Sequence, residues 1–505
     1  MPFFLIKFVD FFLLFDNNLK MFLPELFLAT SILCLTIHAS LLVTSRFFGN
    51  FLIIRSFLSI SWFVVSISLV LTNNDPILCM FAFQNTFIFD ILTSSIKQLL
   101  LFATLICLIL STNSIISNQL NHFEYLILLL SAILGLMLLV SSFDMLSLYL
   151  SMEMQSLCLY VLAASKKDSS FSMEAGLKYF IIGSFSSGLL LFGISLLYIS
   201  TGTTNFAHLE LLFFENMTDS TFLKSSLEKS LFFLGAAFFF KIAAAPFHFW
   251  SPDVYEGSPL SSTVFFAIVP KIALFTVFIR LFQTVFLSFE ASISFFLLIF
   301  SLCSVVFGSF TALSQKKLKR LLAFSSISHV GYLLLAFSIN SIEGTQSLFF
   351  YLVIYLLTSL CIWSIFIGLS TFDNNFKSRT IGDLSSLSTI NPLLALTAIF
   401  SFFSLASIPP LVGFLAKIEI FINSLSVHTF FPSFFLILSS VVSCFYYIRL
   451  IKISYFDKSE RFSFVFPLSK YSSLVLGFGF FSLVFLFINP LLLLFLSHKM
   501  ALDIF

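Results

Sequence analysis

Charged residues are scarce in this sequence. Asp, Glu, Lys and Arg make up 10% of its 505 residues, whereas they make up about a quarter of an ordinary soluble domain. Hydrophobic residues make up 59%, and the mean hydropathy is +1.07. A soluble protein of this composition could not cover its surface with polar groups, so lipid must be the solvent for most of the chain. We therefore expect one all-α polytopic membrane domain, in which each span takes roughly 20 apolar residues.

Metal and nucleotide motifs are also missing from the sequence. The seven cysteines are scattered, and no two of them are close enough to form a Cys-x-x-Cys metal or redox pair. There is no Gly-rich phosphate loop and no basic stripe that would bind nucleic acid. We therefore expect no cofactor and no metal site in this chain, and in particular neither an iron–sulfur cluster nor a haem.

Long apolar runs divide the chain into about fourteen predicted transmembrane helices. They fall near residues 22–43, 51–72, 91–111, 123–141, 143–164, 177–199, 231–250, 261–283, 291–313, 320–339, 346–371, 388–425, 431–453 and 470–497. The run 388–425 carries Pro409, Pro410 and Gly413 near its middle, which predicts one broken helix.

Basic and acidic residues alternate between the connecting loops. Loops after odd-numbered spans carry the basic residues Arg46, Arg55, Lys166, Lys167, Lys316, Lys317, Lys319, Arg320, Lys377, Arg379, Arg449 and Lys452. Loops after even-numbered spans carry mainly acidic residues, namely Asp75, Asp90, Glu210, Glu215, Asp219 and Glu343. Because short loops rich in Lys and Arg stay on the side of synthesis, we expect the odd loops to face the cytoplasm or the mitochondrial matrix. The N-terminal residues 1–15 are expected to be a mature extension or short helix, and not a signal peptide.

Three lysines and one glutamate lie at mid-span depth on four different predicted helices, where a charge is costly. They are Glu153 in the fifth run, Lys241 in the seventh, Lys271 in the eighth and Lys417 in the twelfth. One interpretation is structural, in which ion pairs lock helices together. Lys outnumbers Glu, however, and a buried Lys near a carboxylate can switch between its charged and neutral forms. We therefore favour a proton relay.

Two histidines also lie in or near apolar runs. His329 is either a core histidine bonded to a neighbouring hydroxyl or a relay that links the two halves of the chain. His248 is a possible relay residue, with the same alternative. Three further charges are interpreted as contacts at the ends of spans: Lys178 as a snorkelling residue, Asp144 as a polar cap, and Glu419 as a helix-end or partner contact.

Prolines break two of the charged spans. Pro246 follows Lys241 by five residues, and Pro409 and Pro410 precede Lys417 by a turn or two. A proline removes a backbone hydrogen bond, and in lipid the freed carbonyl needs a partner from protein or water. A broken helix at mid-membrane therefore indicates a hydrated cavity.

The two breaks lie five spans apart, which predicts two five-helix repeats with the second inverted relative to the first. The expected organisation is helices 1–3 in residues 1–119, a first half-channel repeat (helices 4–8) in 120–285, a second (helices 9–13) in 286–455, and helix 14 in 456–505.

Four motifs closely resemble the antiporter-like subunits of respiratory complex I, NADH:ubiquinone oxidoreductase. They are Tyr149–Ala164 (YLSMEMQSLCLYVLAA), Glu174–Gly188, Phe240–Pro259 (FKIAAAPFHFWSPDVYEGSP) and Lys319–Tyr332 (KRLLAFSSISHVGY). Within this family the pattern is most similar to the mitochondrial subunit 2 branch, the counterpart of bacterial subunit N. Lys417 favours this branch, because subunit 4 carries a Glu on span twelve. The likeness covers roughly residues 120–450 well.

The resemblance implies a fourteen-helix antiporter-like fold with discontinuous spans seven and twelve, and a proton-translocating role in the mitochondrial inner membrane. It implies that Glu153 and Lys241 form a coupling pair, that Lys271 bridges, and that His329 and Lys417 continue the path. Glu419 departs from the family pattern and puts the charge balance near Lys417 in doubt. NADH, FMN, iron–sulfur clusters and ubiquinone are expected in partner subunits, and the expected partners are other membrane-arm subunits and lipids. The 75 Phe residues fit an A+T-biased genome such as that of an organelle.

Three other interpretations stay open. A subunit of a multi-chain cation/proton antiporter shares this fold but needs no electron-transfer partners. A passive scaffold would join neighbouring membrane subunits without moving protons. A chloroplast relative that receives electrons from ferredoxin is the third, although the sequence resembles the mitochondrial members more closely.

Overall fold

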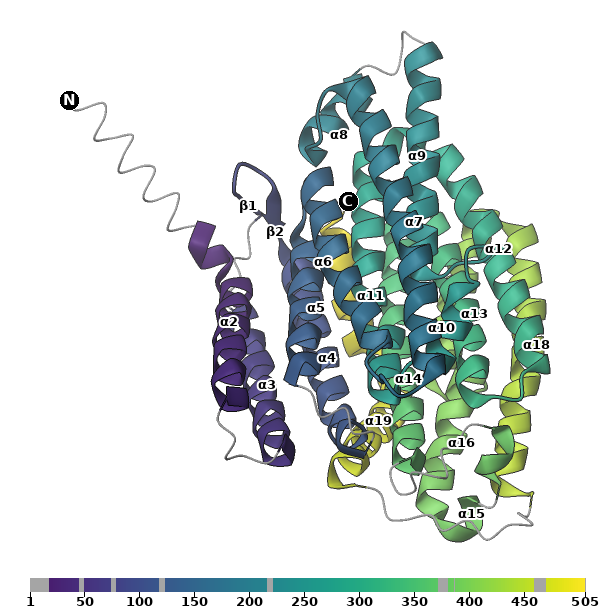
Figure 1. The fold of residues 1–505 in the computed structure, drawn as a ribbon. Helices are drawn as coiled ribbons and strands as arrows, with labels where there is room; N and C mark the ends of the chain where they lie inside the picture. The colour runs from purple at the N-terminus through teal and green to yellow at the C-terminus, as the bar shows by residue number, and fades with distance from the viewer. Residues whose placement is uncertain are drawn as a thin grey trace.

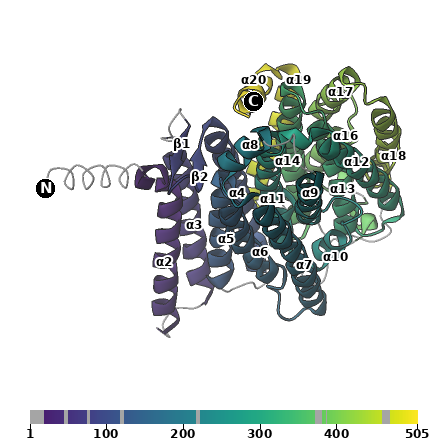
Figure 2. The ribbon, with the colours of Figure 1, turned by 90° about the horizontal axis from the view of Figure 1, so that it is seen from above.

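The described residues of the computed structural model are 18–44, 50–73, 79–117, 123–215, 221–370, 380–385, 387–457 and 469–504. They form one bundle in which most of the long helices run side by side (Figure 1). Seen from above, the N-terminal helices form one edge of the bundle and the C-terminal half forms the opposite side (Figure 2). The one sheet within the described ranges is an antiparallel ribbon of β1 (Met80–Ala82) and β2 (Phe87–Phe89).

Twelve helices among the described residues are long and apolar enough to cross a membrane, which confirms the expected all-α polytopic class. They are α2 (Leu23–Thr44), α3 (Asn50–Thr72), α4 (Ile91–Ser117), α5 (Phe123–Ser141), α6 (Met145–Ala163), α7 (Ser170–Thr201), α11 (Leu260–Ile279), α12 (Glu290–Ser314), α13 (Leu318–Ser338), α14 (Ile342–Ser370), α18 (Phe430–Tyr455) and α19 (Lys470–Ile488).

The other two predicted spans, the seventh and the twelfth, are each made of two pieces. The first consists of α9 (Thr221–Ile242) and α10 (Trp250–Gly257), and the second of α16 (Pro392–Ala406) and α17 (Val412–Ser426). These elements fall outside the twelve because α9 carries several charged residues and the other three are short.

The backbone turns sharply at both interruptions. Ala243 follows α9 with a φ of 64°, and Ser407 follows α16 with a φ of 60°. A non-glycine residue in this left-handed region cannot continue a right-handed helix. Pro246 lies in the first gap, and Pro409 and Pro410 lie in the second.

The C-terminal span departs from the prediction. A single helix was expected over 470–497, but α19 ends at Ile488 and a separate helix, α20 (Leu491–Leu502), begins after Pro490. The proline lacks the amide that would continue the α19 ladder. The sequence also did not predict the β1–β2 ribbon or the short elements, which are α8 (Phe206–Glu215), the π-helix η1 (Arg280–Val285), the 3₁₀ turns η2 (Leu287–Phe289) and η3 (Ile381–Leu384), and α15 (Leu387–Ile390).

Helix α11 forms the centre of the bundle. All residues in the most apolar stretch of this span are buried inside the bundle. The corresponding share is 94% in α13 and 83% in α14, but only 22% in α2. The outer helices expose large apolar side chains such as Leu41, Phe185 and Phe307, as expected for surfaces that face lipid. A charged residue on α11 therefore lies far from both lipid and solvent.

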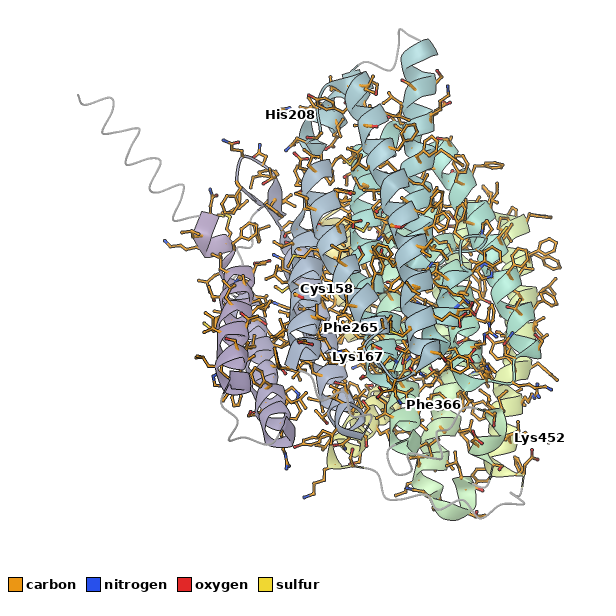
Figure 3. The ribbon with its side chains drawn as sticks, viewed as in Figure 1. Cys158, Lys167, His208, Phe265, Phe366 and Lys452 are labelled. Carbon is orange, nitrogen blue, oxygen red and sulfur yellow. The ribbon has the colours of Figure 1, made fainter. Side chains whose placement is uncertain are left out.

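The loops of odd and even number lie toward opposite ends of the bundle where they are described. Figure 3 labels Lys167 and Lys452 in its lower half and His208 near its upper end. The compartment that each end faces stays a prediction. The predicted loop residues Arg46, Asp75, Asp219, Lys377 and Arg379, and the N-terminal segment 1–15, lie outside the described residues.

Candidate functional site: a buried polar axis

The first part of the axis joins α6 and α9. Lys241, in the last turn of α9, donates a hydrogen bond of 3.4 Å to the hydroxyl of Tyr160 on α6, and its Nζ lies 5.9 Å from the centre of that ring. Glu153 lies two turns before Tyr160 on the same helix, half-buried, and its Oε1 has no hydrogen-bond partner. Both residues are described, and no ion pair joins them. The structure therefore holds the predicted coupling pair near but apart.

A glycine on α7 leaves the space that the Tyr160 side chain occupies. A Cβ atom at Gly183 of α7 would lie 1.9 Å from the Tyr160 hydroxyl oxygen and 2.4 Å from its Cζ. The tyrosine hydroxyl thus occupies the space that any side chain at this position of α7 would need. The ring also meets Tyr179 edge-on, with centroids 4.7 Å apart.

A small cavity connects the first two lysines. Lys241 and Lys271 both line a cavity of about 20 Å³, together with the polar side chains Gln155, Ser156, Tyr255 and Ser326. A water needs roughly 10–15 Å³ measured in this way, together with polar partners. The cavity therefore has room for about one water among these polar side chains.

Lys271 of α11 contacts a helix from the second half of the chain. It follows Pro270 inside α11, is buried, and donates a hydrogen bond of 3.2 Å to the hydroxyl of Tyr355 on α14. Tyr355 lines a second cavity of about 20 Å³, and His329 of α13 lines the same cavity. The imidazole and the Tyr355 ring are 5.3 Å apart between centroids.

His329 bonds through both ring nitrogens. Its Nδ1 lies 2.6 Å from the hydroxyl of Tyr351 on α14, and its Nε2 lies 3.3 Å from the hydroxyl of Tyr447 on α18. In a neutral imidazole one nitrogen donates and the other accepts. His329 therefore connects three helices, an arrangement that satisfies the core interpretation and also permits the relay.

Lys417 lies at the far end of the axis. It is buried on α17, and its Nζ lies 4.6 Å from the centre of the Tyr332 ring of α13. Glu419 points elsewhere, because its carboxylate accepts a 3.5 Å hydrogen bond from Gln346 of α14. Glu419 thus contacts a neighbouring helix of this chain, and its interpretation as a helix-end or partner contact stays a prediction.

The second helix break brings backbone into close contact. Gly413 lies in the first turn of α17, and a Cβ there would lie 1.9 Å from the carbonyl oxygen of Ser404 in α16. The two pieces of the broken span therefore approach each other where only glycine fits.

His248 lies apart from the axis. It is buried in the gap between α9 and α10, its Nδ1 has no hydrogen-bond partner, and its ring lies among those of Phe249, Phe307 and Phe324. It lines neither of the two small cavities. Its possible relay role stays a prediction without a described polar neighbour that would continue the path.

A charged cluster connects the lower ends of α7, α10 and α13. Asp253 of α10 pairs with Lys178 at 2.9 Å and with Arg320 at 2.6 Å, and Arg320 also pairs with Glu256 at 3.1 Å. Lys178 further pairs with Glu174 at 2.7 Å. Lys178, which we expected to snorkel, joins α7 to α10 through its pair with Asp253. Its side chain is 42% exposed.

The sequence did not predict two buried ion pairs away from the axis. Lys97 of α4 and Glu25 of α2 lie 2.7 Å apart, with side chains 0% and 3% exposed. Arg280 in η1 and Asp90, just before α4, lie 2.6 Å apart. Lys97 falls inside the third predicted span, so its charge was a usable signal, whereas Asp90 was assigned to a loop.

The sequence also did not predict the tyrosines of the axis. Four tyrosine hydroxyls form hydrogen bonds with Lys241, Lys271 or His329, and they belong to Tyr160, Tyr351, Tyr355 and Tyr447. A fifth tyrosine, Tyr332, contacts Lys417 through its ring. Buried tyrosine hydroxyls usually find a hydrogen-bond partner, so tyrosines inside spanning runs were the available signal.

Asp144 is the predicted cap, since its side chain accepts a hydrogen bond from the amide of Leu146 at the start of α6.

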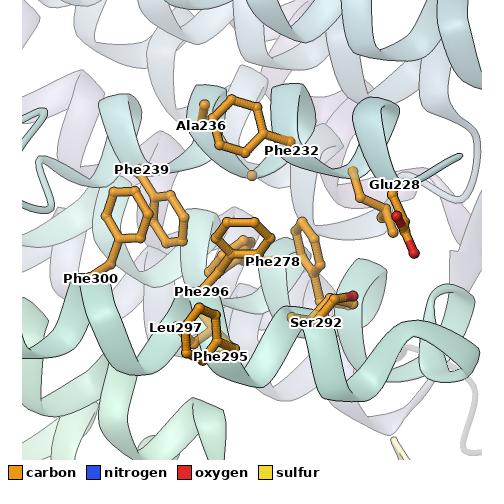
Figure 4. Close-up of a pocket in the computed structure, with 14 residues that line it drawn as sticks. Glu228, Phe232, Ala236, Phe239, Phe278, Ser292, Phe295, Phe296, Leu297 and Phe300 are labelled. Carbon is orange, nitrogen blue, oxygen red and sulfur yellow. The ribbon is translucent and has the colours of Figure 1, made fainter. Parts of the chain in front are cut away.

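A larger cavity, about 330 Å³, lies among α9, α11 and α12 and is apolar. Figure 4 shows its aromatic lining, with Glu228 and Ser292 together at one end and the stacked pair Phe239 and Phe300 at the other. Such a lining offers no chain of donors and acceptors, so this cavity is separate from the polar axis.

Among the residues that the structure describes, no three His, Cys, Asp or Glu side chains gather as a metal site would require.

Comparison with known proteins agrees with the resemblance seen in the motifs. Residues 142–445 match the family described as NADH:quinone oxidoreductase/Mrp antiporter, transmembrane. The NADH-ubiquinone oxidoreductase chain 2 of Marchantia polymorpha is 38% identical over 97% of this chain and 99% of its own length. The NADH-quinone oxidoreductase subunit N of Pelagibacter ubique is 38% identical over 88% of this chain and 91% of its own.

A solved structure agrees as well. A chain of respiratory complex I from Thermus thermophilus superposes with a TM-score of 0.75 at 27% identity, and the match covers 93% of this chain and 98% of that one. The family match spans both broken helices, Lys241, Lys271, Lys417 and His329. The chain therefore belongs to the NADH:quinone oxidoreductase/Mrp antiporter transmembrane family, as one of its antiporter-like subunits.

Proposed function

We propose that this chain is a proton-translocating membrane-arm subunit of NADH:ubiquinone oxidoreductase, respiratory complex I, in the mitochondrial inner membrane. Its relatives at 35–38% identity over most of the chain carry the names chain 2 and subunit N of that oxidoreductase. Electron transfer from NADH through FMN and iron–sulfur clusters to ubiquinone takes place in partner subunits, and we expect no redox centre in this chain. Its immediate partners are other membrane-arm subunits and lipid.

Protons cross along the axis Glu153, Lys241, Lys271, His329 and Lys417. The observation that supports this path is its continuity from Lys241 to His329, where tyrosine hydroxyls and two water-sized cavities lie beside successive groups. Lysines buried without a paired carboxylate are costly in a merely structural core. A relay gives these lysines a purpose, since each one can hold a proton in turn.

The proposed organisation is fourteen crossings, which are the twelve continuous helices together with the broken pairs α9–α10 and α16–α17. The half-channel repeats occupy 120–285 and 286–455, the second inverted, between helices 1–3 in 1–119 and helix 14 in 456–505. The loops rich in Lys and Arg face the matrix. The two breaks occupy corresponding places in the two repeats, at the fourth helix of each.

Coupling works through the Glu153–Lys241 separation. A conformational or electrostatic change that arrives from the redox subunits moves the carboxylate relative to the ammonium group. When Glu153 approaches, Lys241 keeps its proton, and when it withdraws, Lys241 releases the proton to the water-sized cavity that it shares with Lys271. The proton then passes on toward His329 and onward to Lys417.

The test is Lys241→Ala in the assembled complex, with Lys229→Ala as the matched control. Lys229 is an exposed lysine on the same helix, so its loss removes the same charge without touching the axis. We expect Lys241→Ala to lower the number of protons moved per NADH, and Lys229→Ala to leave it unchanged. A normal proton stoichiometry with Lys241→Ala would refute the proposed path.

Two alternatives predict different outcomes. A subunit of a multi-chain cation/proton antiporter would purify without flavin and iron–sulfur subunits. A passive scaffold would lose assembly, but not proton stoichiometry, when Lys241, Lys271 or Lys417 is neutralised.

A further inference from the structure

Helix α10, the short second piece of the broken seventh span, carries one side chain that touches both water-sized cavities. Tyr255 lines the cavity that holds Lys241 and Lys271, and it also lines the cavity that holds His329. Its side chain is 3% exposed. Only Ser326 of α13 shares this double position among the lining residues of these two cavities.

Hydroxyl-bearing side chains gather around Tyr255. Tyr255, Ser326 and Tyr355 all line the second cavity. Tyr355 in turn accepts the hydrogen bond from Lys271 at 3.2 Å. These side chains therefore contact the first cavity, the second cavity and the lysine of α11 at one place.

We propose that the Tyr255 hydroxyl is the junction at which protons cross from the Lys241–Lys271 cavity to the His329 cavity. The inference rests on the proposed function and adds a residue that passes protons between the two repeats. A tyrosine hydroxyl donates and accepts at once. It accepts a proton from water in the first cavity as its own proton leaves toward Ser326 and the second cavity, and rotation of the hydroxyl then restores the starting state. Tyr255 is neutral before and after each transfer.

The charged cluster holds this residue in place. Asp253 and Glu256 flank Tyr255 on α10. They form ion pairs with Lys178 of α7, with Arg320 of α13 and with Lys317, which directly precedes α13. Tyr255 is thereby directed inward from a helix of only eight residues. Because the pairs reach α7 on one side and α13 on the other, they fix α10 relative to both halves of the chain.

The experiment compares Tyr255→Phe with Tyr125→Phe in the assembled complex. Each change removes one hydroxyl oxygen, and Tyr125, on α5, is equally buried at 3% exposure but lines neither cavity. Three quantities are measured: the amount of assembled complex, the rate of NADH:ubiquinone electron transfer, and the protons moved per NADH. We expect Tyr255→Phe to lower the protons per NADH as far as Lys241→Ala does, and Tyr125→Phe to leave the ratio unchanged.

A purely structural role for Tyr255 would lower assembly and rate together and leave the ratio of protons to NADH unchanged, which would overturn the proposal. If Tyr255→Phe does not assemble, Ser326→Ala removes the shared hydroxyl with a smaller change, and an unchanged ratio in that variant would overturn it equally. Lys241→Ala distinguishes a failure of the Tyr255 junction from a failure of the proposed function. A loss with Lys241→Ala but not with Tyr255→Phe refutes only the junction, whereas a normal ratio in both variants refutes the proposed function itself.

Discussion

The contact between Gly183 and Tyr160 predicts that a single added methyl group will disturb the Lys241 site. In Gly183→Ala the new Cβ would lie 1.9 Å from the Tyr160 hydroxyl oxygen, whereas ordinary contacts begin near 3.4 Å. The ring or helix α7 must therefore move by about 1.5 Å, the difference between these two distances. The hydrogen bond from Lys241 to Tyr160 is already 3.4 Å long, so such a movement breaks it.

The cost to stability should be modest. Overpacking of a core costs typically about 1–3 kcal/mol, while Gly to Ala in a helix interior returns up to about 1 kcal/mol. Gly188→Ala is the matched control, because it lies on the same helix and nothing lies within 4 Å of the atom added there. The two variants thus gain the same helix propensity and differ only in the contact with Tyr160.

The assay measures assembly and protons moved per NADH in purified complex returned to vesicles. We expect Gly183→Ala to assemble at a reduced level and to move fewer protons per NADH, while Gly188→Ala behaves like the unmodified protein. Tyr160→Phe should reproduce the loss of protons without the loss of assembly, since it removes the same hydrogen bond and adds no atom. If Gly183→Ala matched Gly188→Ala in both measurements, Tyr160 would have no part in the relay.

Two further predictions concern stability. Glu25→Gln leaves the Lys97 ammonium buried without its partner, which should cost about 3–5 kcal/mol and lower the thermal midpoint of the complex, whereas the double variant Glu25→Leu with Lys97→Met should recover most of the loss. A double variant no more stable than Glu25→Gln would contradict this reasoning. Gly413→Ala brings a Cβ to 1.9 Å from the carbonyl oxygen of Ser404, whereas Gly477→Ala meets nothing within 4 Å. The first should reduce the assembled complex and the second should not, as measured by native gel; equal amounts would show that the broken span tolerates the added atom.

Much of the fold follows from local properties of the chain. Lipid sets a condition that each segment meets by itself, namely about 20 apolar residues with an internally satisfied backbone, and twelve described helices meet it. The prolines at 246, 409 and 410 mark the gaps in the two broken spans for an equally local reason, since proline lacks an amide donor. The single helix expected over 470–497 was wrong because Pro490 was not weighed in the same way.

The candidate site was only partly predictable. Glu153, Lys241, Lys271, His329 and Lys417 stood out because charge and imidazole are rare in apolar runs. The tyrosines between them did not stand out, because Tyr also occurs at lipid-facing and interfacial positions. Their role depends on neighbours from other helices, which hydropathy does not encode.

The sequence by itself determined that most of this chain lies in a lipid bilayer. It also determined at which residues most helices begin and break, and which charged residues lie in segments that lipid surrounds. Only the tertiary structure decided what those charges meet. Lys271 and Tyr355 are 84 residues apart in the chain, and His329 and Tyr447 are 118 apart. Contacts over such separations depend on how helices pack and rotate against each other, which no single span encodes. This packing brought Glu419 of α17 within reach of Gln346 of α14 and placed Tyr255 beside two cavities.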